Sequence, residues 1–196
     1  SILVSVTFFV TGINIIRNDS TITSGERLGQ ISFVGTENAH SNFGYGARIE
    51  ALTTEAWTEG SAEGTKLVFH TTDNSSATLD ARMTIDHNGK VGIGTSSPAT
   101  KMHIQEDSAV AALYIDHNEN HNAISIDAEN TTSYSVYVES DALTTGKMLY
   151  LKSNSSSTGT RNLVEIHNDH ASATGTTGLK ILQDSTGYAL NAVSAS

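Results

Sequence analysis

The sequence predicts an all-β protein built as an elongated homotrimeric fibre, with an N-terminal β-domain followed by a repetitive β shaft. Three observations lead to this prediction: a short apolar motif recurs through the second half of the chain, the apolar fraction is only 37%, and no segment has convincing helical periodicity. A supersecondary unit that returns at short intervals is typical of elongated repeat proteins. The expected shaft is a triple β-helix or a β-prism-like structure.

The recurring motif has the form apolar–any–apolar–polar. Its copies begin at residues 113, 124, 136, 149, 164, 179 and 190, so successive copies lie 11 to 15 residues apart. Alternation with a period of two belongs to a β-strand with one buried face. The second apolar residues of the motif are therefore expected in the core of the shaft: Ile115, Ile126, Val138, Leu151, Ile166 and Ile181.

One copy of the motif buries too little apolar surface to fold alone. Its two inward side chains contribute roughly 1.5–3 kcal/mol each when buried, whereas ordering the backbone of a ~13-residue unit costs about 13–26 kcal/mol. Three identical chains that face a common axis close the apolar face and supply the missing burial. A monomeric β-solenoid is the alternative, but its coils usually keep a near-constant length and these do not.

The only proline, Pro98, is the predicted boundary between a β-rich domain with long loops, residues 1–98, and the repetitive shaft, residues 99–196. Proline fixes its own φ and biases the preceding residue to an extended conformation, which suits a boundary. In the first domain, alternating apolar residues predict strands at 3–11, 12–17, 29–35, 46–53, 65–71, 81–86 and 90–94.

The last two of these strands form the clearest hairpin, joined by residues 87–89, which read His-Asn-Gly. Asn-Gly accepts the positive φ values that a tight hairpin turn requires. The alternation then places four apolar residues of the structural core on one face of the hairpin: Met83, Ile85, Val91 and Ile93. Val68 interrupts the alternation between Leu67 and Phe69, which predicts a strand that is buried on both faces or bulged.

Charge and composition exclude several classes of function. The chain has 21 acidic and 11 basic residues, a net charge of −10 and no basic cluster, so no nucleic-acid partner is expected. The acidic surface also disfavours anionic membranes. Without cysteine, neither a disulfide nor a thiolate metal site can form. The apolar run at 2–10 is too short to span a membrane and is predicted to be a strand buried against symmetry mates or preceding sequence.

No catalytic or cofactor site is predicted, and the chain is not expected to be an enzyme. The glycine-containing segment 92–95 lacks the following helix and lysine of a phosphate loop. Asp116, Asp127 and Glu139 follow strands and could form an acidic ladder for calcium or glycoside hydrolysis. The favoured interpretation is that they face solvent or bond turn amides.

The histidines of the shaft form two short pairs within polar turns. One histidine from each of three chains could hold a metal ion on the axis. Solvated loop residues are the favoured interpretation for these side chains: His117, His121, His167 and His170.

Trp57 is the one candidate ligand-binding residue. It lies near three carboxylates, Glu55, Glu59 and Glu63, and a tryptophan ring beside carboxylates can stack on a sugar. A lone tryptophan in a small β-domain is more often a core anchor, so the core is favoured and a ligand surface is the alternative.

The segment 81–98, ARMTIDHNGKVGIGTSSP, resembles a recurring signature of bacteriophage tail fibres and tailspikes, RM-x-I-D-x-x-G-x-V-G-I-G-T-x-x-P, which precedes the distal shaft. Residues 64–72, residues 48–51 with Trp57, and the repeats after 113 are also similar to these proteins. The resemblance covers roughly residues 45–196.

The resemblance implies a parallel homotrimer located in the virion, a structural component of a tail fibre that supports attachment to a host receptor. The implied partners are other virion tail proteins and a host-surface glycan. Many such fibres end in an endosialidase-type intramolecular chaperone that is cleaved after assembly, and no such domain is visible in this sequence. A microbial cell-surface fibre or carbohydrate-binding adhesin is the alternative, and a tailspike depolymerase with carboxylates split across chains ranks last.

Overall fold

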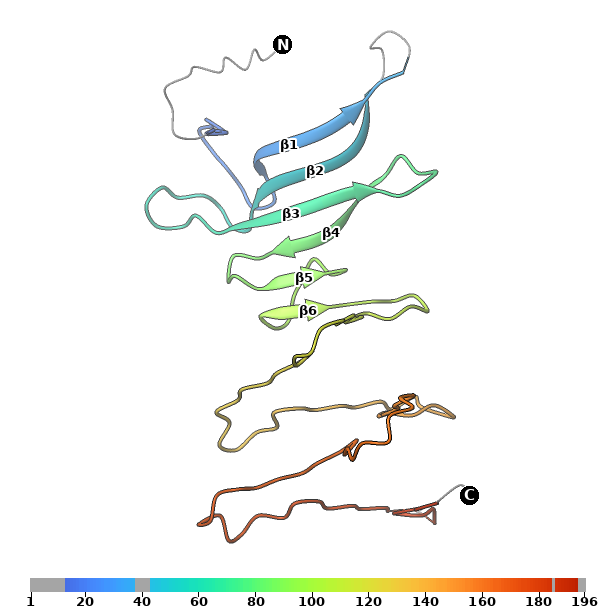
Figure 1. Cartoon of the computed structure of the whole chain (residues 1–196). Coiled ribbons are helices and arrows are strands. Elements are labelled where there is room, and N and C mark those ends of the chain that lie inside the picture. The colour runs from blue at the N-terminus through green and yellow to red at the C-terminus, as the bar shows by residue number, and fades with distance from the viewer. Residues whose placement is uncertain (1–12, 38–42, 185, 194–196) are drawn as a thin grey trace. The chain divides into compact units, whose positions relative to one another are not determined.

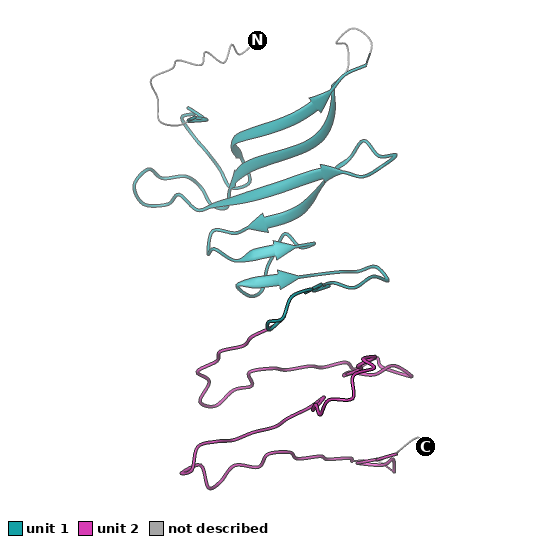
Figure 2. Ribbon diagram, viewed as in Figure 1, with its two compact units in different colours: residues 1–123 teal, residues 124–196 magenta. Residues whose placement is uncertain are grey.

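A computed structural model describes residues 13–37, 43–184 and 186–193 (Figure 1). These residues form strands, turns and extended segments but no helix, which confirms the all-β prediction. It follows that the described residues include no helix long and apolar enough to cross a membrane. The chain divides into two compact units, residues 1–123 and residues 124–196 (Figure 2).

The first unit contains one open, mixed sheet of six strands, arranged in the order in which they occur in the chain. Neighbouring strands are antiparallel except the last two, which are parallel (Figure 1). The strands are β1 Arg27–Gly35, β2 Gly44–Thr53, β3 Thr65–Thr72, β4 Leu79–Ile85, β5 Val91–Ile93 and β6 Met102–Ile104.

Most of the strands predicted for the first domain are confirmed, with small shifts at their ends. The five predicted segments between residues 29 and 94 correspond to β1 through β5. The strand predicted at 3–11 lies outside the described residues. β6 was not predicted. It follows Pro98, so the sheet continues beyond the predicted domain boundary. The two compact units instead divide between residues 123 and 124.

The prediction of a strand at 12–17 is wrong for residues 13–17, the part that the structure describes, because these residues are not in a strand. Side chains, not backbone pairing, attach this segment to the sheet. The Arg17 guanidinium donates to the Arg27 carbonyl oxygen at 3.2 Å and to the Glu26 carboxylate at 2.9 Å. The Ile15 side chain occupies the space where a Cβ on Gly29 would lie.

The hairpin of β4 and β5 has the predicted geometry. Met83 lies opposite Ile93 and Ile85 lies opposite Val91, which confirms that the four share a face. In the turn, the Asp86 carboxylate accepts the backbone N–H groups of residues 88 and 90, each at 2.8 Å. Gly89 has a φ of 68°, as a tight hairpin turn requires.

The connection from β5 to β6 lies across the other face of the sheet. The Thr95 carbonyl oxygen occupies the space that a Cβ on Gly92 would need, and Pro98 is buried. Val68, on this same face, is only 4% exposed, and the pairing of β3 with β4 shifts register between Phe69 and His70. The register shift is consistent with the predicted bulge. Burial on both faces is not found, because Leu67 and Phe69, which point to the other face, are only half-buried.

In the second unit, no strand occurs among residues 124–184 and 186–193, and every described residue except Ala173 is exposed. The strands predicted for the motif are thus not formed by a single chain. An extended segment becomes part of a sheet only when a neighbouring backbone pairs with it, and one chain does not supply that neighbour here.

Candidate assembly surface

The register of the six strands defines two apolar rows on one face of the sheet, because directly opposite residues share a face. The first row crosses all six strands: Ile31, Ile49, Phe69, Met83, Ile93 and Ile104. The second row crosses β2 to β6: Ala51, Leu67, Ile85, Val91 and Met102. We call these two rows the apolar band.

The apolar band is open in a single chain. Ile31 is 51% exposed, Ile93 40% and Met102 60%. Apart from Pro98, Val68 is the only aliphatic or aromatic side chain that is buried among the residues that the structure describes, and it lies on the opposite face. Exposed apolar surface that is continuous over several elements marks an interaction site. Four sequence-predicted core residues belong to this band, and none of them is buried in one chain: Met83, Ile85 and Val91 are half-buried and Ile93 is exposed.

The opposite face carries a charged cluster centred on Glu50, whose side chain is only 4% exposed. The Glu50 carboxylate accepts hydrogen bonds from Arg27 Nε at 2.6 Å and from Arg48 Nη2 at 3.0 Å. His70 Nε2 lies 2.8 Å from the same carboxylate. We call these four residues the Glu50 cluster. Burial alone raises the pKa of the Glu50 carboxyl, but the hydrogen bond and charge of Arg27, with the charge of Arg48, hold that pKa below its usual value of 4.5.

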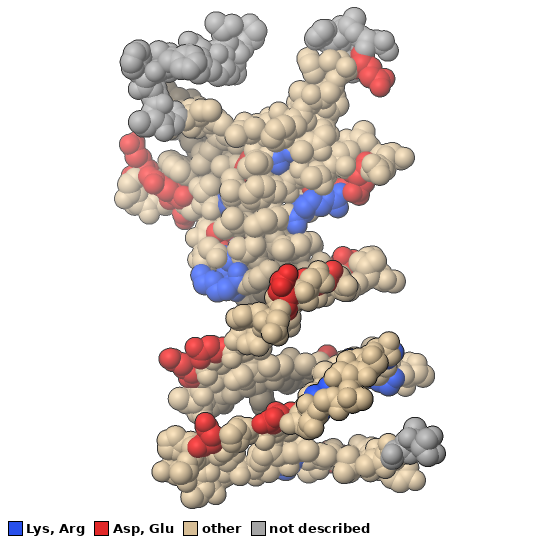
Figure 3. Space-filling model, viewed as in Figure 1, with Lys and Arg blue, Asp and Glu red and all other residues tan. Residues whose placement is uncertain are grey.

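Sequence reasoning missed the Glu50 cluster. The signal was present, because Arg48 and Glu50 flank Ile49 and therefore share the face opposite to it. Figure 3 shows acidic side chains in both units and few basic ones on the face in view, with no continuous basic patch.

We expect Glu50→Gln to lower the free energy of unfolding by about 2 kcal/mol at pH 7, because it leaves two arginines without their anionic partner. The folded-state pKa of Glu50 is depressed, so its contribution is present at neutral pH and is lost as the pH falls below about 4.5. The difference in thermal stability between the wild type and Glu50→Gln should therefore shrink as the pH is lowered from 7 to 3. The exposed Glu59→Gln is the matched control, and an equal loss of stability in that variant would contradict the role of the cluster.

Trp57 lies in the loop between β2 and β3 and is half-buried. Its backbone N–H donates to the Ile22 carbonyl oxygen at 2.9 Å. Two of the nearby carboxylates bond loop amides: Glu55 accepts from the N–H of Gly64 at 2.7 Å, and Glu63 accepts from that of Gly60 at 2.8 Å. These two carboxylates thus stabilise the loop that holds the tryptophan.

The other candidate polar groups are not brought together. The described residues contain no group of three or more side chains able to hold a metal ion. The candidate carboxylates and histidines of the repeat region are each exposed: Asp116, His117, His121, Asp127, Glu139, His167 and His170.

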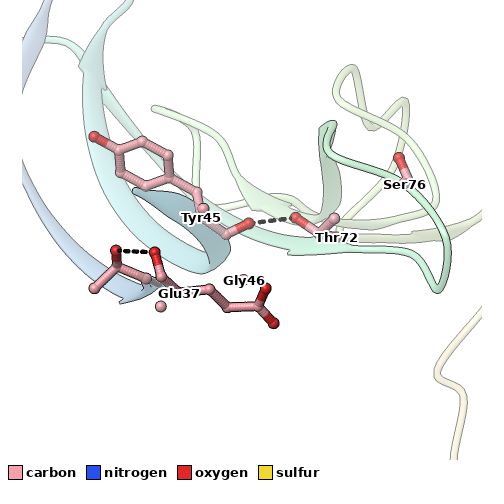
Figure 4. A pocket seen from close by; sticks show the side chains of 8 residues that line it. Glu37, Tyr45, Gly46, Thr72 and Ser76 are labelled. Carbon is pink, nitrogen blue, oxygen red and sulfur yellow. Dashed lines mark hydrogen bonds between the residues drawn. The ribbon is translucent and has the colours of Figure 1, made fainter. Parts of the chain in front are cut away.

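One hollow of about 580 Å³ lies at the ends of β1, β2 and β3 (Figure 4). Glu37, Tyr45 and Ser76 are among its lining residues, and Thr72 Oγ1 donates to the Tyr45 carbonyl oxygen at 2.7 Å. A single carboxylate and a single phenol in an open hollow do not make a hydrolytic pair.

No protein-family model matches this chain. No sequence among the curated proteins matches it either.

Proposed function

We propose that this chain is one subunit of a homotrimeric fibre, the shaft-forming part of a bacteriophage tail fibre that supports attachment to a host receptor. The observation that carries the proposal is the lack of backbone partners in the repeat region. Within residues 106–182 there are three backbone-to-backbone hydrogen bonds, and each joins residues at most three positions apart. Buried backbone groups in folded proteins are nearly always paired, so burial of the apolar residues of this region requires backbone partners, which neighbouring chains can supply.

The apolar side chains of the repeats support the same proposal. Each contributes roughly 1.5–3 kcal/mol when it becomes fully buried, and threefold closure around an axis buries all of them together. In a single chain, the residues expected in the shaft core are between 44% and 59% exposed: Ile115, Ile126, Val138, Leu151, Ile166 and Ile181.

The assignment to a virion rests on the resemblance of residues 81–98 to the tail-fibre signature. Its glycines and its turn have structural roles in this chain, at Gly89, Gly92 and Gly94. In this proposal the partners are two further copies, other tail proteins of the virion and a glycan of the host surface. The alternative is a microbial surface fibre or carbohydrate-binding adhesin; the partly exposed Trp57 favours it, and binding of the full chain to a glycan array would support it.

The mass of the native particle tests the proposal. A trimer of 20.7 kDa chains has a mass of about 62 kDa in sedimentation equilibrium or native mass spectrometry. We expect this mass to persist on dilution and the complex to resist SDS until it is heated, because the chains share one core. A folded, heat-stable particle of one chain at dilute concentration would contradict the proposal.

A further inference from the structure

We infer that the apolar band is the surface through which copies of this chain pack against one another, with the Glu50 cluster facing away from the neighbouring copies. The inference rests on the proposed homotrimer. It extends the interface from the repeats after residue 113 to the six-stranded sheet of the first unit, including β1 to β3, which carry no copy of the repeat motif.

The shape of the band fits like copies better than a globular partner. The first row crosses six strands, five steps of ~4.8 Å, and is thus about 24 Å long, while the two rows lie only about 7 Å apart. A stable interface between two globular proteins buries about 800 Å² on each side, which a compact patch provides only if it is much wider than these two rows. A long, narrow apolar stripe instead suits identical chains packed side by side along it, as in the seam of a coiled coil.

The spacing of the band links it to the repeats. Ile93, Ile104, Ile115 and Ile126 follow one another at intervals of 11 residues. The first two of them face each other across the parallel pair of β5 and β6. The pattern of two apolar residues on each strand thus begins in the sheet, well before residue 113. A surface that repeats the same pattern is suited to the same partner.

Burial and charge distinguish the two faces of the sheet. On the polar face, Val68 is 4% exposed and Thr84 is fully buried, and the Thr95 carbonyl oxygen lies over Gly92. That face therefore has a cover of its own. On the apolar face, the described residues show a covering side chain only at the β1 edge, where Ile15 lies against Gly29, the partner of Ala51. A sheet must bury the rest of its apolar face against another layer. Each copy carries a net charge of −10, so copies approach most favourably where no charged residue lies, and the band contains none.

The absence of cysteine allows a clean test with single cysteine variants of the full chain. Ala51→Cys places a thiol in the band, and Lys66→Cys places one on the opposite face, one register position away. We expect mild oxidation to give covalent dimers on a non-reducing SDS gel for Ala51→Cys and none for Lys66→Cys. A water-soluble maleimide should react at least tenfold more slowly with Ala51→Cys than with Lys66→Cys in the native particle, and equally fast after denaturation.

The native mass of each variant separates the inference from the proposal on which it rests. A trimer in which Ala51→Cys reacts as fast as Lys66→Cys would overturn the inference and leave the trimer intact. A monomeric wild type would overturn both. Ile93→Cys tests the other row. Slow reaction without cross-linking at both Ala51→Cys and Ile93→Cys would mean that the same chain covers the band, and would overturn the inference.

Discussion

Replacing Ile126 with aspartate should prevent assembly of the trimer. In the proposed shaft, three copies of this residue meet near the axis, and the substitution places three carboxylates there. Each pair of charges about 4 Å apart repels by about 4 kcal/mol at an effective dielectric constant of ~20, and each carboxylate also loses its hydration. In one chain Ile126 is 57% exposed, so the substitution costs an isolated chain almost nothing.

Ser125→Asp is the matched control for this variant. Ser125 lies in the middle of the same motif, and alternation directs it away from the axis. Native mass and SDS resistance should therefore be lost in Ile126→Asp and kept in Ser125→Asp. Recovery of an SDS-resistant trimer from Ile126→Asp would count strongly against the proposed shaft.

Gly94→Ala should lower the free energy of unfolding of the sheet by about 3–5 kcal/mol. Gly94 has a φ of 73°, a conformation that alanine adopts only with strain. In addition, the Cβ of the new alanine would overlap the backbone carbonyl oxygen of Gln105. Relief of that overlap requires a shift of the backbone. The N–H of Gln105 donates to the Ile93 carbonyl oxygen at 2.9 Å, so this shift would separate β6 from β5.

Gly89→Ala separates the two causes. Gly89 has a similar φ of 68°, but the nearest atom to its Cβ would be the flexible end of Lys101, at 3.9 Å. It should therefore cost only the backbone strain, about 1–2 kcal/mol. Urea unfolding of the full chain measures both values, and hydrogen exchange at the Gln105 amide should accelerate in Gly94→Ala alone. Equal losses in the two variants would contradict the steric argument.

The hairpins of the sheet could be predicted because their signals are local. The strand pairs are neighbours in the sequence, and the alternation around Met83, Ile85, Val91 and Ile93 fixes both the face and the register. The segment at 13–17 has similar apolar residues, but its last residue, Arg17, binds Glu26. That contact depends on the folded chain and left no signal in the alternation.

Other features depend on contacts that are distant in the sequence. β6 is only three residues long and pairs parallel to β5 through a connection that contains Pro98, so its own composition did not reveal it. The Glu50 cluster unites residues from three strands, from Arg27 to His70, and requires the register of all three. The repeats after residue 113 have a strong strand pattern, yet pairing of a strand depends on a neighbour that a single sequence does not specify.

The scarcity of internal backbone bonds in residues 106–182 has a consequence for the order of events during biogenesis. The sheet, whose strands pair in chain order, has mostly local contacts and can form quickly within each newly made polypeptide. In the proposed trimer, the remainder of the chain would gain order only when three copies meet, so this step would depend on protein concentration. Recovery from denaturant should then show one rapid phase independent of protein concentration and one slow phase that accelerates as the concentration rises.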